Sequence, residues 1–117
     1  MRYCNSLTKF SRFKTRLVQI GNLKIGENYP IAIQSMTITD TMDTLATVEE
    51  SIRMIKAGCE LVRITAPSKK EAENLQNIKD GLRENGYKTP IVADIHFTPN
   101  AAEIAAEIVE KVRINPG

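Results

Sequence analysis

One pattern recurs along this chain: a short run of apolar, β-prone residues, then a helix-start signal, then an amphipathic helical segment. The apolar runs begin near Ile31, Leu61 and Ile91, at intervals of 30 residues, and a fourth run from Lys111 follows about 20 residues later. Strands joined by helical crossovers of this length pair in parallel, with right-handed connections. The pattern therefore predicts successive βα units in a parallel sheet.

The predicted strands cover residues 31–35, 61–65, 91–95 and 111–115. They are mostly apolar on both faces, as buried parallel strands are. A hairpin is expected before them, because Gly21-Asn22 separates two β-prone runs within residues 16–24 and both residues tolerate positive φ.

The helix starts carry their own signals. Thr47 to Glu50 is a capping box that predicts Thr47 as the N-cap of the first helix, which should end at Gly58. Ser68 to Glu71 is a second capping box, whose helix should bury Leu75, Ile78 and Leu82 and end at Gly86. Thr98 as N-cap before Pro99 predicts the third helix, over residues 101–108.

Two architectures accommodate parallel βα units: a doubly wound sheet and a (β/α)₈ barrel. No GxGxxG or GxxxxGK segment follows any predicted strand, which weakens the nucleotide-binding alternative. A complete barrel needs about 250 residues, whereas this chain has 117. We therefore predict an α/β fold that is the N-terminal part of a TIM-type (β/α)₈ barrel, about four βα units after a leading β-hairpin. Residues 1–15 form a basic N-terminal extension, and 16–117 a partial barrel domain.

Composition narrows the function classes. At 42% apolar and 26% charged residues, with a formal net charge of +2, the chain is an ordinary globular protein. It lacks the excess charge of a nucleic-acid or membrane-surface protein, and it shows no bilayer-spanning or secretory segment, so a cytoplasmic location is the expectation. Cys4 and Cys59 lack metal-ligand spacing, so we expect no metal site; Cys59 should be a small core residue that opens a strand.

Polar side chains interrupt the strands at their carboxyl ends. Because side chains alternate along a strand, Arg63 should share a face with Thr65, Asp94 with His96, and Arg113 with Asn115; Gln34 should lie at a comparable place on the first strand. In a barrel, the carboxyl ends of the strands form the mouth where active sites are built.

A buried arginine is costly unless it is paired. The charged residues could therefore form a structural ion-pair cluster of Arg63, Arg113 and Asp94, or they could line a ligand site. Their repetition on three strands favours the ligand site. Two guanidiniums and an imidazole at one mouth suit an anionic, phosphorylated ligand, because the arginine fork matches phosphate oxygens. The threonine-rich loop 37–47 is either a helix-capping loop or a mobile lid.

The motifs KTRLVQIGN, IQSMTITDT, ELVRIT, PIVADIHF and VRINPG resemble, in order and spacing, the family of 4-hydroxy-3-methylbut-2-enyl diphosphate synthases. The resemblance runs from about Lys14 to Gly117, and the DTMDT loop and KVRINPG ending resemble its long, three-domain form from plants, chlamydiae and the Bacteroidetes group.

The resemblance implies a barrel that binds 2-C-methyl-D-erythritol 2,4-cyclodiphosphate in isoprenoid biosynthesis. It implies substrate binding by Arg63, His96, Arg113 and Asn115, and a catalytic place for Asp94 near the substrate hydroxyls. The family's redox chemistry uses a 4Fe-4S cluster with ligands in a C-terminal domain, and a reductant such as ferredoxin or flavodoxin. The chain is thus expected to be an inactive N-terminal fragment of a homo-oligomeric oxidoreductase, cytoplasmic or plastidic. The alternatives are another phosphate- or pterin-binding barrel, resembling dihydropteroate synthase, and an inert, self-associating fragment.

Overall fold

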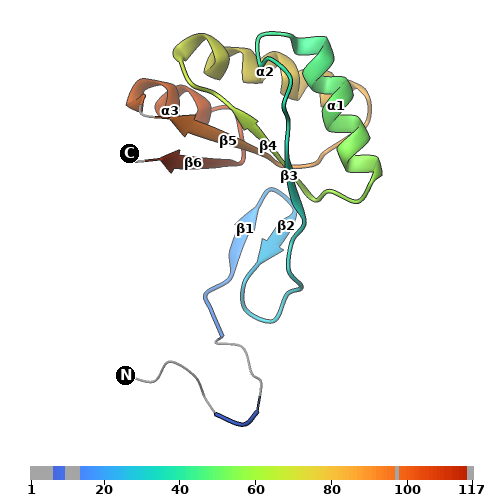
Figure 1. The fold of residues 1–117 in the computed structure, drawn as a ribbon, viewed down its shortest axis with the longest axis vertical. Helices are drawn as coiled ribbons and strands as arrows, with labels where there is room; N and C mark the ends of the chain where they lie inside the picture. Colours follow the sequence, from blue (N-terminus) through green and yellow to red (C-terminus); the bar gives the residue numbers. More distant parts are fainter. Residues whose placement is uncertain (1–6, 10–13, 97, 116–117) are drawn as a thin grey trace.

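The computed structural model describes residues 7–9, 14–96 and 98–115 of the chain. Strands and helices alternate along most of it (Figure 1). The elements, in chain order, are β1 (Val18–Ile20), β2 (Leu23–Ile25), β3 (Gln34–Met36), α1 (Thr44–Lys56), β4 (Leu61–Thr65), α2 (Lys69–Glu84), β5 (Ile91–His96), α3 (Pro99–Ala106) and β6 (Lys111–Asn115). Within the described residues, no helix combines the length and the apolar character needed to cross a membrane.

The four parallel strands lie in sequence order, β3-β4-β5-β6. The three helices that connect them cover the same face of the sheet (Figure 1). A doubly wound sheet would reverse its strand order at a switch point and carry helices on both faces. The sequential order therefore confirms the predicted segment of a (β/α) barrel.

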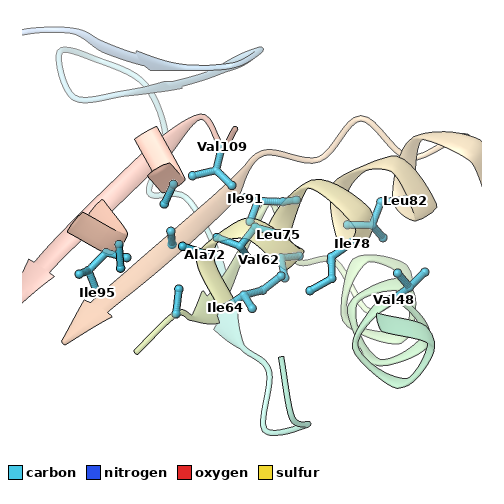
Figure 2. Packing of buried hydrophobic residues seen from close by; sticks show 14 of the residues in the cluster. Val48, Val62, Ile64, Ala72, Leu75, Ile78, Leu82, Ile91, Ile95 and Val109 are labelled. Atoms are coloured by element: carbon cyan, nitrogen blue, oxygen red, sulfur yellow. The ribbon is translucent and has the colours of Figure 1, made fainter. Parts of the chain in front are cut away.

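The main core lies between the sheet and its helices. Every second strand residue faces this layer, including Val62 and Ile64 of β4, and α2 contributes Leu75, Ile78 and Leu82, as predicted (Figure 2). All five side chains are fully buried. Burial of each side chain stabilises the fold by roughly 1.5–3 kcal/mol, because its apolar surface is removed from water. This layer therefore gives the strands a rigid support.

The leading hairpin forms as predicted, with Ile20 opposite Leu23 across the two-residue turn. Gly21 adopts φ 58, a left-handed conformation that favours glycine, and a Cβ there would come within 3.2 Å of Pro90, just before β5. Ile20 packs in a second, smaller cluster with Leu61 and Val92. The hairpin therefore covers the amino end of the face that the helices leave open.

The first parallel strand is shorter than predicted. It covers Gln34–Met36 rather than 31–35, and all three of its residues are exposed, so the expectation of a buried strand here is wrong. Ile33 lies just outside the strand, and its amide donates to the Glu60 side chain over 3.3 Å. Within the described sheet β3 pairs only with β4, so half of its backbone groups have no strand to bond.

Two helix boundaries also differ from the prediction. Helix α1 begins at Thr44 with Asp43 as its N-cap, whose carboxylate accepts the Ala46 amide at 3.2 Å, so Thr47 is not the N-cap. Thr47 instead lies inside the helix and donates its hydroxyl hydrogen to the carbonyl of Asp40, seven residues earlier in the loop. Both residue types are good N-caps, but the helix begins four residues earlier than predicted, so Asp43 takes the N-cap position.

Helix α3 also differs from its predicted bounds: it covers Pro99–Ala106 rather than 101–108, after the predicted N-cap Thr98. Ser68 is the N-cap of α2, as predicted.

Gly81 of α2 allows the close packing of α2 against α1. A Cβ at this position would lie 2.9 Å from Cγ2 of Val48. We expect Gly81→Ala to destabilise the chain, because overpacking costs about 1–3 kcal/mol and exceeds the roughly 1 kcal/mol that alanine adds to helix propensity. Chemical denaturation of Gly81→Ala, Val48→Ala and the double variant measures this. The double variant should be at least about 1 kcal/mol more stable than the sum of the single effects predicts; simple additivity would contradict the close contact.

Candidate functional site

The face of the sheet opposite the helices carries the charged residues selected from the sequence. The register places Asp94 of β5 beside Arg113 of β6, and His96 beside Asn115. Arg63 lies two residues before Thr65, which is the partner of Asp94 on β4. Paired residues in a parallel sheet share a face, so the alternation predicted for the three strands is confirmed. We call this face the inner face.

Three cationic or polar side chains converge on one carboxylate. Arg63 donates from Nη2 to Oδ2 of Asp94 over 2.7 Å, and Arg113 donates from Nη1 to Oδ1 over 2.9 Å. His96 Nε2 lies 3.0 Å from Oδ2. The Asp94 side chain is only 1% exposed, whereas those of Arg63, His96 and Arg113 are 26%, 36% and 43% exposed. The carboxylate therefore lies at the base of the cluster, with the two guanidiniums and the imidazole between it and solvent.

The carboxyl group of Asp94 is strongly acidic. Burial alone raises its pKa, but hydrogen bonds from Arg63, Arg113 and His96, together with the charge of Arg63, outweigh burial and lower the pKa to about 2. At neutral pH Asp94 is an anion that can only accept hydrogen bonds. His96 Nε2 must therefore carry the hydrogen that it shares with Asp94, which fixes the orientation of its ring.

The cluster retains positive charge and donor capacity after this pairing. One carboxylate balances one of the two guanidiniums, and the second charge remains. Arg63 Nε is buried and has no hydrogen-bond partner among the described residues. A guanidinium has five N–H donors in a rigid fork, and Asp94 occupies one nitrogen of each arginine. The geometry suits an anion with several oxygens.

Gln34, which was predicted to lie at a level comparable to the charged residues, lies elsewhere on the sheet. Gln34 pairs with Leu61 at the beginning of β4, and Met36 is the residue that pairs with Arg63. The prediction that Gln34 lies at a carboxyl strand end is therefore wrong, because the short β3 begins at Gln34. Gln34 instead lines a hollow beside the hairpin, together with Leu61 and Lys111. Lys111 shares the inner face with Arg113 two residues further on, and the alternation that selected Arg113 would have found it.

The loop between β3 and α1 is held by hydrogen bonds. Thr41 donates its hydroxyl hydrogen to the Thr65 carbonyl over 2.6 Å, and Asn74 of α2 donates to the Thr41 carbonyl over 2.7 Å. The Glu50 carboxylate of α1 accepts the amide of Ile38 over 2.7 Å. Of the two interpretations left open by the sequence, these contacts favour a capping loop over a mobile lid. Thr41 and Asn74 are buried polar residues that sequence reasoning did not select.

The described residues do not fit an iron–sulfur cluster. Cys59 is buried in the main core, as predicted, and Cys4 lies outside the described residues. In the part of the chain that the structure describes, no three His, Cys, Asp or Glu side chains are grouped so that they could hold a metal ion. A four-iron cluster needs three or four cysteine thiolates, and the whole sequence has two cysteines.

Fold and cluster together define a (β/α)-barrel segment whose charged residues gather at the carboxyl ends of its strands. Residues 15–117 match the family described as the GcpE TIM-barrel domain. The chain belongs to this family, and the resemblance seen in its motifs is confirmed.

The chain is also similar to curated relatives named 4-hydroxy-3-methylbut-2-en-1-yl diphosphate synthase. It is 50% identical to the flavodoxin-type protein of Protochlamydia amoebophila over 116 residues, 99% of the chain and 18% of the relative. It is 56% identical to that of Phocaeicola vulgatus over 111 residues, with 95% and 18% covered. It is 48% identical to the ferredoxin-type, chloroplastic protein of Arabidopsis thaliana over 116 residues, with 99% and 16% covered. The chain thus spans less than a fifth of these relatives.

The stability of the fold should depend on the charge of Asp94 in acid. Its pKa of about 2 lies below the ordinary value of 3.8, so the anion stabilises the fold above about pH 4, and that contribution is lost as the pH falls toward 2. Asp94→Asn should unfold more easily than the unchanged chain at pH 6. This difference in unfolding free energy should shrink by about 2 kcal/mol between pH 6 and pH 2. Chemical denaturation across this range measures it, with Asp80→Asn, at an exposed carboxylate of α2, as the control. Equal pH dependence in both variants would contradict the assignment.

Proposed function

We propose that this chain forms part of the substrate-binding barrel of a 4-hydroxy-3-methylbut-2-enyl diphosphate synthase, an oxidoreductase that reductively opens 2-C-methyl-D-erythritol 2,4-cyclodiphosphate. The observation that carries the proposal is the convergence of Arg63, Arg113 and His96 on the buried Asp94. The names of the relatives support the reaction. They also favour it over a pterin-binding barrel.

In this proposal, Arg63, His96, Arg113 and Asn115 bind the diphosphate. The arginines approach phosphate oxygens through the donors that Asp94 leaves available, and each charge-assisted hydrogen bond contributes more than a neutral one. Asp94 fixes both guanidiniums before the ligand arrives, so little side-chain entropy is lost on binding. We assign Asp94 a catalytic place near the substrate hydroxyls: its Oδ1, which accepts a hydrogen bond from Arg113, has one lone pair left for a hydroxyl hydrogen. A carboxylate with a pKa of about 2 is too weak a base to remove a proton at neutral pH.

The proposal assigns the redox chemistry to parts of the enzyme other than the described residues. A 4Fe-4S cluster would supply the two electrons of the ring opening, and its ligands are not among these residues. Flavodoxin and ferredoxin appear in the names of the relatives, and we propose one of them as the reductant. We also propose residues 1–15 as an extension, 16–117 as the partial barrel domain, and a cytoplasmic or plastidic location.

A graft tests the proposal. Replacing the matching segment of the Protochlamydia amoebophila relative with residues 15–117 of this chain should give an enzyme that binds the cyclodiphosphate and turns it over with reduced flavodoxin. In this graft, Arg113→Ala should weaken substrate binding by about 2–4 kcal/mol, because a charge-assisted contact is lost and substrate charge is left unpaired. Arg113→Lys should recover part of the loss, since it restores the charge without the fork. Isothermal titration measures the three affinities.

Arg53→Ala is the matched control, because it removes an exposed arginine of α1, on the helix-covered side. It should leave the affinity unchanged. If the folded Arg113→Ala graft binds as tightly as the unchanged graft, Arg113 is a structural residue only. If the unchanged graft binds no cyclodiphosphate, the proposed function is wrong.

We also propose that the 117-residue chain self-associates. Within the described sheet, β3 and β6 each pair on one side only, and open strand edges promote association. Ile114 of β6 is 65% exposed beside an apolar hollow formed with Ile95 and Ala102. Sedimentation velocity should show concentration-dependent oligomers that Ile114→Lys weakens. Leu45→Lys, at an apolar residue of α1 that is 70% exposed, should leave them unchanged. A monomer at every concentration would contradict the proposal.

A further inference from the structure

The rim loop, residues 37–43, continues the edge of the sheet where β3 has ended. Strand β3 stops at Met36, whereas β4 continues to Thr65. The Thr37 amide donates to the Arg63 carbonyl over 3.0 Å, and the Thr41 hydroxyl donates to the Thr65 carbonyl over 2.6 Å. A side chain therefore occupies the place that the next strand amide would take. Both carbonyls belong to the stretch of β4 that carries Arg63.

Asn74 fixes the rim loop from the side of α2. Its Nδ2 donates to the Thr41 carbonyl over 2.7 Å and to the Thr44 hydroxyl over 2.9 Å. Its Oδ1 accepts from Nδ2 of Asn77 over 2.9 Å. Asparagine is unfavourable inside a helix, and a buried amide is costly unless it is hydrogen-bonded. Here both ends of the amide are used, and one of its partners is the loop that reaches β4.

A third contact comes from α1. Glu50 accepts the amide of Ile38, and Thr47 donates to the Asp40 carbonyl over 2.9 Å. The rim loop is thus tied to β4, α1 and α2. Thr65 pairs with Asp94 across the next strand, so the Thr41 contact is one strand away from the carboxylate that orients both arginines.

We propose that Thr41 and Asn74 are positioning residues of the anion site: together they hold the rim loop against the end of β4 and so fix Arg63 relative to Asp94. The inference rests on the proposed function, because the affinity that it concerns is that for the cyclodiphosphate. It adds two residues, from the loop and from α2, that do not touch the charged cluster in this structure. Their effect passes through the backbone of β4 at Arg63 and Thr65.

Thr41→Val tests the inference in the graft described above, because valine keeps the shape and the β-branch but removes the hydroxyl donor. We expect the dissociation constant for the cyclodiphosphate, and with it KM, to rise about tenfold, while kcat changes less than threefold. Thr41→Ser restores the donor and should return both constants to within about threefold of the unchanged graft. A role in stability alone would lower Tm without this split between KM and kcat.

Asn74→Asp provides the second arm, since it keeps the acceptor oxygen and removes the amide that donates to Thr41 and Thr44. It should raise the dissociation constant in the same direction. Asn85→Asp is its matched control, because Asn85 is an exposed residue at the end of α2 whose Nδ2 donates to the Gly81 carbonyl over 2.7 Å. It loses a hydrogen bond of the same length from a side-chain amide to a backbone carbonyl, far from the carboxyl ends of the strands, and it should leave the affinity unchanged.

Hydrogen exchange of the Thr37 amide, measured without ligand, reports directly on the attachment of the loop. It should accelerate in Thr41→Val and remain slow in Asn85→Asp. The inference is overturned if both site variants exchange faster yet bind the cyclodiphosphate as tightly as the unchanged graft, or if neither affinity nor exchange changes. An unchanged graft that fails to bind is a distinct result, because it overturns the proposed function and this inference together.

Discussion

The buried carboxylate of Asp94 connects the charged side chains of three strands on the inner face of the sheet. Two arginines from the neighbouring strands and a histidine from its own strand meet on its two oxygens. Removing one partner of a buried ion pair costs far more than the net contribution of the pair, because the other charge is left unpaired. The positions of Arg63, His96 and Arg113 are therefore mutually dependent. A site built in this way has its cations in place before an anion arrives.

The two faces of the sheet have different tasks. The helix-covered face is an apolar layer, and its fully buried side chains, among them Ile64, Ile78 and Ile95, fix the height and spacing of the strands. The inner face depends on that spacing, since hydrogen bonds of 2.7–3.0 Å across three strands tolerate little displacement. Packing on the helix-covered side thus holds the strands at the spacing that the hydrogen bonds of the charged cluster need on the inner face.

Periodicity, turn residues and capping residues were enough to predict the order of elements and the hairpin, because all three are local properties of the sequence. Alternation along each strand was enough to predict the face shared by Arg63, Asp94, His96, Arg113 and Asn115. The predictions were wrong where strand pairing or competing residues, rather than the local pattern, determine the position of a residue. Gln34 lies nearer the amino end of the sheet than predicted, because it pairs with Leu61, the first residue of β4. Helix α1 begins after Asp43, which takes the N-cap position predicted for Thr47. The contact of Thr41 with Asn74 joins residues 33 positions apart, and no local pattern contains it.

The hairpin at the amino end of the strands has a consequence for the direction from which a ligand can approach the inner face. Ile20 covers the inner face at Leu61 and Val92, while the charged cluster lies toward the opposite ends of the same strands. On the described sheet the amino end of the inner face is therefore covered, and an anion reaches the charged cluster from the uncovered part of that face or from the carboxyl ends of the strands.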